Sequence, residues 1–148
     1  MNPVKVFAID IDGTITINGN GAVNLDALSK LRYLVKLGHK IIYVTGRSSI
    51  EAYVLSIFGG TTKIAIGENG GVITKSPVDH ILLADKEKCL KGYKILKEKF
   101  GDIENKLVFP RMTEVVLTRT FDINQGNKIL EENDLDLVLV DSNYALSS

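Results

Sequence analysis

In the first half of the chain, short apolar runs alternate with segments whose apolar residues recur at helical spacing. Val4 to Ile9 is a nearly continuous apolar run, which is typical of a parallel strand covered on both faces. Leucines and valine then recur at helical spacing from Leu25 to Val35. Asn24 before them is a good N-cap residue, and Gly38 after them is a good stop. The pattern predicts a strand followed by an amphipathic helix.

The same alternation repeats once more. Residues 40–44 predict a second buried strand, and Ser48 with Glu51 three residues later forms a capping box for a helix that ends near Phe58. Residues 63–67 predict a third short strand, which a glycine-rich turn follows. Strand, helix, strand, helix, strand is the order of a doubly wound parallel sheet with right-handed crossovers.

The pattern changes from about Asp79. The second half predicts a compact unit of β-α-β-β-α-β order, with strands at 80–84, 106–109, 114–119 and 135–140 and helices at 85–100 and 124–133. Ser76-Pro77 supplies a plausible hinge. We therefore predict an α/β protein with part of a Rossmann-like, doubly wound core in residues 1–78 and an inserted α/β cap domain in residues 79–148.

Composition narrows the class of protein. The 148 residues are 45% hydrophobic, and 18 basic side chains balance 18 acidic ones, so charge offers no argument for a nucleic-acid or membrane partner. No apolar run approaches the roughly 20 residues of a membrane span. The lone Cys89 is expected to pack as a small core residue. Without a signal-peptide pattern at its N-terminus, the chain is expected to be cytoplasmic.

Two carboxylates lie where the first strand ends. Asp10 and Asp12 follow the apolar run, and Thr45-Gly46 follows the second strand. Ligands of open α/β sheets bind beyond the carboxyl ends of the strands. Strand alternation would turn residues i and i+2 to the same side, and an Mg²⁺ ion between the two carboxylates would offset their repulsion. Gly13 can bring backbone N–H groups toward an anion, as can the helix that opens after Gly46.

These residues resemble the motifs of the haloacid dehalogenase superfamily. "DIDGT" is similar to its first motif and "VTGR" to its second, about 35 residues apart. "GENGG" resembles a loop of the branch with a large α/β cap, in which the archaeal-type phosphoglycolate phosphatases are the most similar. The resemblance implies a hydrolase in which Asp10 is the nucleophile and Asp12 the general acid and base.

The resemblance also implies a cofactor and a phosphate site. Mg²⁺ would be bound by the Asp10 carboxylate and the Asp12 backbone carbonyl, while Thr45 and the Gly46 N–H hold the phosphoryl group. The family further uses a lysine and a "GDSxND"-like motif, and neither is clear in this chain. Lys128 with Asp141 is a weaker substitute, because the chain between them is short for a helix, loop and strand. We expect the 148-residue chain to be weakly active or inactive.

Plainer interpretations compete for several residues. A calcium loop of the EF-hand type does not fit the position of Gly13. Arg47 is expected to be a solvated residue of the first helical turn rather than a phosphate ligand. Glu68 and Asn69 are expected to shape a turn, with a metal or substrate role as the alternative. Arg111, after Pro110, either meets a substrate carboxylate or is a surface charge.

The function expected is an Mg²⁺-dependent phosphatase of carbohydrate metabolism that acts through an aspartyl phosphate on a small phosphorylated acid, such as phosphoglycolate, or a sugar. The alternatives are a sugar phosphomutase and an inactive fragment or phosphate-binding module. The partner expected is a small phosphorylated metabolite, with self-association through an exposed sheet edge possible. Fold alone does not determine the substrate.

Overall fold

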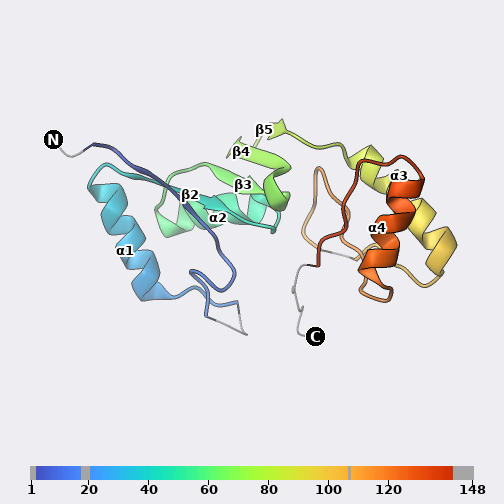
Figure 1. The fold of residues 1–148 in the computed structure, drawn as a ribbon. Helices are drawn as coiled ribbons and strands as arrows, with labels where there is room; N and C mark the ends of the chain where they lie inside the picture. The colour runs from blue at the N-terminus through green and yellow to red at the C-terminus, as the bar shows by residue number, and fades with distance from the viewer. Residues whose placement is uncertain (1–2, 18–20, 107, 142–148) are drawn as a thin grey trace. The chain divides into compact units, whose positions relative to one another are not determined.

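The computed structural model describes residues 3–17, 21–106 and 108–141. They form two compact units (Figure 1). The first holds the residues up to Ala84 together with Phe109–Met112, and the second holds the remainder. Each unit has its own hydrophobic core.

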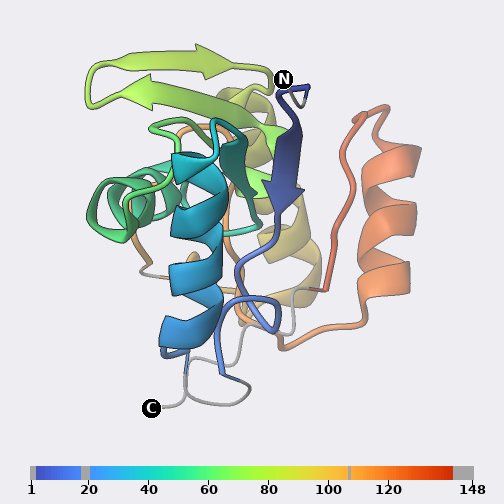
Figure 2. The ribbon, with the colours of Figure 1, turned by 90° about the vertical axis from the view of Figure 1, so that its left-hand side faces the viewer.

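The first unit is built on a five-stranded sheet in the order β1-β2-β3-β4-β5, with β1 at one edge and β5 at the other (Figure 2). The first three strands are parallel and the last two antiparallel. Their bounds are β1 Val6–Ile9, β2 Lys40–Val44, β3 Ala65–Gly67, β4 Val72–Ser76 and β5 Asp79–Leu82. The predicted α/β class is confirmed, although the sheet is mixed rather than wholly parallel.

Both crossover helices begin where their capping residues predict. Helix α1 (Leu25–Lys36) begins after Asn24, whose side chain accepts hydrogen bonds from two backbone N–H groups of the first turn. Helix α2 (Ser49–Gly59) begins after Ser48 with the complete capping box, and it ends at Gly60 in the left-handed conformation. The two helices contribute to one core against the sheet, formed by Ile11, Ile15, Tyr43, Ala52, Tyr53 and Ala65 with Leu31 packed against it.

Strand β1 is less covered than its apolar sequence predicts. Val6 is 61% exposed and the strand alternates between exposed and half-buried residues. The prediction of a strand covered on both faces was wrong for the described residues, because β1 is an edge strand in this sheet and pairs with β2 on one side. An edge strand with an exposed valine is a surface prone to pairing, so self-association stays a prediction.

The predicted hinge is a hairpin turn. Ser76 and Pro77 lie in the tight connection between β4 and β5, where Ser76 pairs with Asp79. Strand β4 was not predicted from the sequence, and residues 80–84, assigned there to the cap, instead contribute β5 to the sheet of the first unit. The contact boundary accordingly follows Ala84. Turn residues between two β-forming segments predict a hairpin as readily as a hinge.

A close approach of two backbones fixes β3 against α2. A Cβ atom added to Gly67 would overlap the backbone N and Cα of Ser49, the first residue of α2. Only glycine lets the end of β3 lie this near the start of the helix. The contact matters for the site because the phosphate-binding residues predicted from sequence immediately precede α2.

The second unit packs two helices and an extended segment. Helices α3 (Lys86–Phe100) and α4 (Ile123–Glu132) begin after Asp85 and Asp122, whose side chains cap them. Leu96, Ile103 and Leu130 form its buried core, and the rings of Phe100 and Phe121 stack with centroids 4.9 Å apart. The Cys89 thiol donates to the Thr113 carbonyl at 3.4 Å. Burial, with the charge of Glu114, raises the pKa of this thiol, which agrees with a packing role.

The predicted cap strands are largely absent from the described residues. Residues 104–106 and 116–118 approach each other through one antiparallel bridge, between Asn105 and Leu117, while residue 107 of the predicted strand 106–109 lies outside the described residues. Residues 135–140 belong to no ladder strand, and Leu139 within them bonds instead to the side chain of Asn127. Its Oδ1 accepts from the Leu139 N–H at 2.7 Å and its Nδ2 donates to the Leu139 carbonyl at 3.3 Å.

No helix among the described residues is long and apolar enough to cross a membrane.

Replacing Gly67 with alanine is expected to lower the free energy of unfolding by about 3 kcal/mol, the upper end of the usual cost of overpacking, because the added methyl meets backbone atoms that cannot rotate away. Urea denaturation measures this. Gly38→Ala is the matched control: Gly38 has φ +88° and open space around it, so only a left-handed backbone cost of about 1–2 kcal/mol is expected. Equal losses for the two variants would contradict the close-packing argument.

Candidate active site at the ends of β1 and β2

A turn anchored by two buried isoleucines carries the carboxylates. Ile11 and Ile15 are each 3% exposed and belong to the core of the first unit. The Ile11 carbonyl accepts the backbone N–H groups of Thr14, Ile15 and Thr16 at 3.0–3.2 Å. The chain therefore turns directly after β1, and the residues between the anchors face solvent.

Asp10 and Asp12 are both exposed on this turn. The Thr14 hydroxyl donates to Asp10 Oδ2 at 3.2 Å. The strand ends at Ile9, so the turn, and not the strand alternation assumed from sequence, sets the direction of the two carboxylates. Gly13 has φ +76°, and its N–H, predicted to approach an anion, donates to Thr16 Oγ1 at 3.0 Å.

The second predicted motif follows the carboxyl end of β2, next to the carboxyl end of β1. Ile9 pairs with Tyr43 in the parallel register of β1 and β2, so Asp10 and Thr45 each follow the last residues of neighbouring strands. Thr45 is 4% exposed, and its Oγ1 accepts the Arg47 N–H at 3.1 Å. Gly46 is exposed and lies just before the capping box of α2, where backbone N–H groups favour an anion.

Arg47 joins the two motifs, which sequence reasoning missed. Its Nε and Nη2 donate to the two carboxylate oxygens of Asp12 at 2.8 and 2.7 Å, and its Nη1 donates to Glu51 at 3.2 Å. The side chain is 21% exposed. The expectation of a solvated residue was wrong. The fold brings Asp12, 35 residues away in the sequence, next to Arg47, and the planar guanidinium matches its carboxylate.

The "GENGG" turn, residues 67–71, is hydrogen-bonded to the loop that contains Thr45 and Gly46. The N–H groups of Glu68 and Asn69 donate to the carbonyls of Arg47 and Thr45, at 2.8 and 3.2 Å. A Cβ atom on Gly46 would lie 2.9 Å from Asn69 Oδ1. Glu68 and Asn69 both have φ +54°, a left-handed backbone that is uncommon outside glycine. The expectation that these residues shape a turn agrees with this geometry.

A segment from the second half of the sequence docks on this loop. Phe109–Met112 belongs to the first unit by its contacts. Ser48 Oγ donates to the Pro110 carbonyl at 3.0 Å, and the Met112 N–H donates to the Glu68 carboxylate at 2.9–3.0 Å. Arg111 Nη1 donates to the Gly46 carbonyl at 2.6 Å. The sequence carried no signal for this docking beyond Pro110, since it depends on contacts between residues more than 40 positions apart.

Oxygen donors dominate the turn after β1. The Asp10 carboxylate and the Asp12 backbone carbonyl are the hard ligands that Mg²⁺ prefers, and Mg²⁺ usually keeps several waters and needs only one or two carboxylates. No group of three or more histidine, cysteine or acidic residues suited to a metal occurs among the described residues. This donor set fits an ion that completes its shell with water and a phosphate, and it fits zinc poorly.

Lys128 and Asp141, the substitutes considered for the family's lysine and acidic motif, each have another partner in the structure. Lys128 lies 3.9 Å from Glu132 on α4, and Asp141 forms an ion pair with Arg119 at 2.8 Å. Both residues belong to the second unit. Residues 142–148, predicted to continue the cap, lie outside the described residues.

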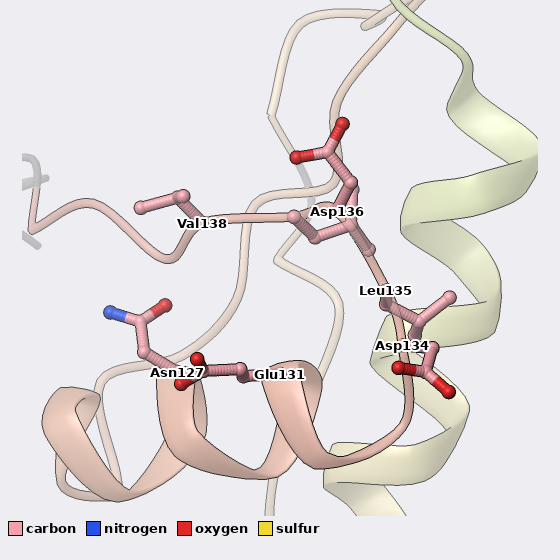
Figure 3. A pocket seen from close by; sticks show the side chains of 7 residues that line it. Asn127, Glu131, Asp134, Leu135, Asp136 and Val138 are labelled. Carbon is pink, nitrogen blue, oxygen red and sulfur yellow. The ribbon is translucent and has the colours of Figure 1, made fainter.

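The second unit contains a separate hollow of about 480 Å³ (Figure 3). Asn127 and Glu131 of α4 line one side and the segment after the helix lines the other (Figure 3). The full lining is Asn127, Glu131, Asp134, Leu135, Asp136, Leu137 and Val138. It holds acidic groups and none of the residues predicted to act on phosphate.

The sheet order and the two loops that follow β1 and β2 define an α/β protein with its candidate site at the carboxyl ends of parallel strands. The chain belongs to the haloacid dehalogenase-like hydrolases, whose family model matches residues 7–143. The resemblance stated from the motifs is thereby confirmed.

Two similar proteins carry a phosphatase name, and one solved structure has a similar fold. The chain is 60% identical over 141 residues to a phosphoglycolate phosphatase of Nitrosopumilus maritimus and 37% identical over 142 residues to one of Archaeoglobus fulgidus, covering 95% of this chain each time. A crystal structure from Thermoplasma acidophilum, 21% identical, has a TM-score of 0.80 over 95% of this chain and 62% of its own. The chain spans 61% and 60% of the two phosphatases.

The Asp12–Arg47 pair is expected to show a coupling of about 1 kcal/mol in a double-mutant cycle with Asp12→Asn and Arg47→Met, because the contact is bidentate and partly buried. Unfolding free energies from urea titration supply the cycle. The pair Lys75–Asp79, 3.1 Å apart and about half exposed, is the control, with an expected coupling below about 0.5 kcal/mol. A coupling no larger than the control's would show that the arginine does not hold Asp12.

Proposed function

We propose that this protein is an Mg²⁺-dependent phosphomonoester hydrolase that acts through an aspartyl phosphate on a small phosphorylated acid or sugar. The observation that carries the proposal is the meeting of the Asp10–Asp12 turn and the Thr45–Gly46 loop at one edge of the sheet, joined by Arg47. The names of the relatives support phosphoglycolate as the substrate to test first.

The reaction has two steps. In the first, an Asp10 carboxylate oxygen attacks phosphorus, the bond from phosphorus to the substrate oxygen breaks, and Asp12 gives its proton to that leaving oxygen. In the second, Asp12 takes a proton from water as the water oxygen attacks phosphorus. The bond to Asp10 then breaks and inorganic phosphate leaves.

The remaining residues hold the groups in place. Thr45 and the Gly46 N–H are proposed to bind the phosphoryl oxygens, with the GENGG turn keeping the loop rigid behind them. Arg47 orients the Asp12 carboxylate and is itself held by Glu51. The Asp10 carboxylate and the Asp12 carbonyl would hold Mg²⁺, which would supply positive charge against the phosphoryl oxygens.

Beryllofluoride, which mimics a phosphoryl group on a carboxylate, identifies the nucleophile without turnover. With Mg²⁺ present, the adduct is expected on an Asp10 oxygen, and Asp10→Asn is expected to abolish it while Asp12→Asn retains it. Crystallography or fluorine NMR of the bound fluorides measures this. An adduct lost only in Asp12→Asn would reverse the two roles.

Phosphate release from 2-phosphoglycolate is expected to depend on Mg²⁺, to stop with a chelator and to return when Mg²⁺ is restored. Asp10→Asn is expected to lower the rate at least about a thousandfold, and Asp12→Asn about 10²- to 10⁴-fold. Asp26→Asn, on the exposed first turn of α1, makes the same change and should leave the rate unaltered. Release that persists in Asp10→Asn would remove the proposed mechanism.

A further inference from the structure

We infer that Arg111 binds a carboxylate of the substrate, so that the site selects a phosphorylated carboxylic acid over a phosphorylated sugar. The inference rests on the proposed function, because it assigns the second half of the ligand whose phosphoryl group the Thr45–Gly46 loop would bind. It decides between the two substrate classes that the catalytic residues leave open.

The position of Arg111 is fixed by the residues on either side of it. The Pro110 carbonyl accepts from Ser48 Oγ at 3.0 Å, and the Met112 N–H donates to Glu68 at 2.9–3.0 Å. Ser48 caps α2, and Glu68 is the first residue of the short 3-10 helix Glu68–Gly70 in the GENGG turn, so both anchors adjoin the Thr45–Gly46 loop. The proline ring also limits the backbone just before Arg111. A backbone segment held this way loses little further freedom when a ligand binds.

Glu68 is an unusual residue to use as an anchor. The residue is 3% exposed and its backbone lies in the left-handed region at φ +54°. Burying a carboxylate and straining a backbone both cost free energy. Both oxygens of this carboxylate accept the Met112 N–H. The buried Glu68 side chain therefore holds the segment that carries Arg111.

The guanidinium lies beside the predicted phosphate site. Arg111 Nη1 is 2.6 Å from the carbonyl of Gly46, the same residue whose N–H is proposed to bind the phosphoryl group. A second anionic group recognised here must therefore be separated from phosphorus by only a few bonds. The planar, five-donor fork of arginine matches a carboxylate in bidentate geometry. A sugar would present neutral hydroxyls at this place, which gain less from a cation.

A purely structural role for Arg111 makes a different prediction. If the Arg111–Gly46 contact only held the segment in place, its loss would disturb the phosphate loop and weaken every phosphate ester by the same factor. Carboxylate recognition instead weakens one ligand selectively. The two roles are separated by comparing 2-phosphoglycolate with ethyl phosphate, in which a methyl group replaces the carboxylate.

The experiment measures dissociation constants of the two esters by calorimetry with Mg²⁺, in the 148-residue chain carrying Asp10→Asn so that neither ester is consumed. Without further change, 2-phosphoglycolate is expected to bind more tightly than ethyl phosphate. Adding Arg111→Met is expected to weaken 2-phosphoglycolate about ten- to hundredfold, the usual effect of losing a hydrogen bond to a charged group, and ethyl phosphate less than about twofold. Arg111→Lys, which keeps the charge without the fork, should fall between.

Equal weakening of both esters, or no weakening of either, would overturn the inference while leaving the proposed hydrolysis intact. Absence of binding by both esters before Arg111 is changed would overturn both proposals. Selective loss, together with a failure of the chain with Asp10 intact to release phosphate, would uphold the carboxylate site and remove the hydrolase.

Arg119→Met is the matched control, because Arg119 is 71% exposed, lies in the second unit and pairs with Asp141. It should leave both constants unchanged. Unfolding curves of every variant check that the fold survives, and Arg111→Lys supplies the selective readout if Arg111→Met does not fold.

Discussion

The burial of Ile11 between two exposed aspartates is the constraint on which the site depends. An isoleucine side chain taken from water contributes about 1.5–3 kcal/mol, whereas a carboxylate buried without partners would cost more than that. With Ile11 in the core and its carbonyl closing the turn, Asp10 and Asp12 are directed to solvent. The two carboxylates that follow the apolar strand are therefore exposed, and the isoleucine between them is buried in the core.

Around that turn the site is assembled in layers. The Thr45–Gly46 loop meets it through Arg47, the GENGG turn supports the loop, and Phe109–Met112 docks on both. These segments lie so close together that a Cβ on Gly46 would collide with the Asn69 side chain and a Cβ on Gly67 with the Ser49 backbone. The left-handed Glu68 and Asn69 are strained residues in the middle of this stack, where surrounding contacts can hold such conformations.

Some predictions failed because a short stretch of sequence does not show which distant residues will pack beside it. The apolar run of β1 is the same whether a strand is central or at an edge, and here its Val6 is exposed. Ser76-Pro77 is equally suited to a hinge and to the hairpin turn that it forms. Residues 135–140 have a strand-like sequence, yet they pair with no strand among the described residues, and the backbone of Leu139 bonds to the Asn127 side chain. In each case the deciding partner lies elsewhere in the chain.

The sequence by itself determined where the helices begin and which candidate groups follow the strands. Caps at Asn24, Ser48, Asp85 and Asp122 act within one helical turn, and the family motifs place carboxylates, hydroxyl and glycine at strand ends, so both could be derived from neighbouring residues. Only the tertiary structure decided how those groups are held. The hydrogen bonds from Arg47 to Asp12 join residues 35 positions apart in the sequence, and the one from Arg111 to Gly46 joins residues 65 positions apart. Such pairs form because packing brings the segments together, and no local spacing encodes them.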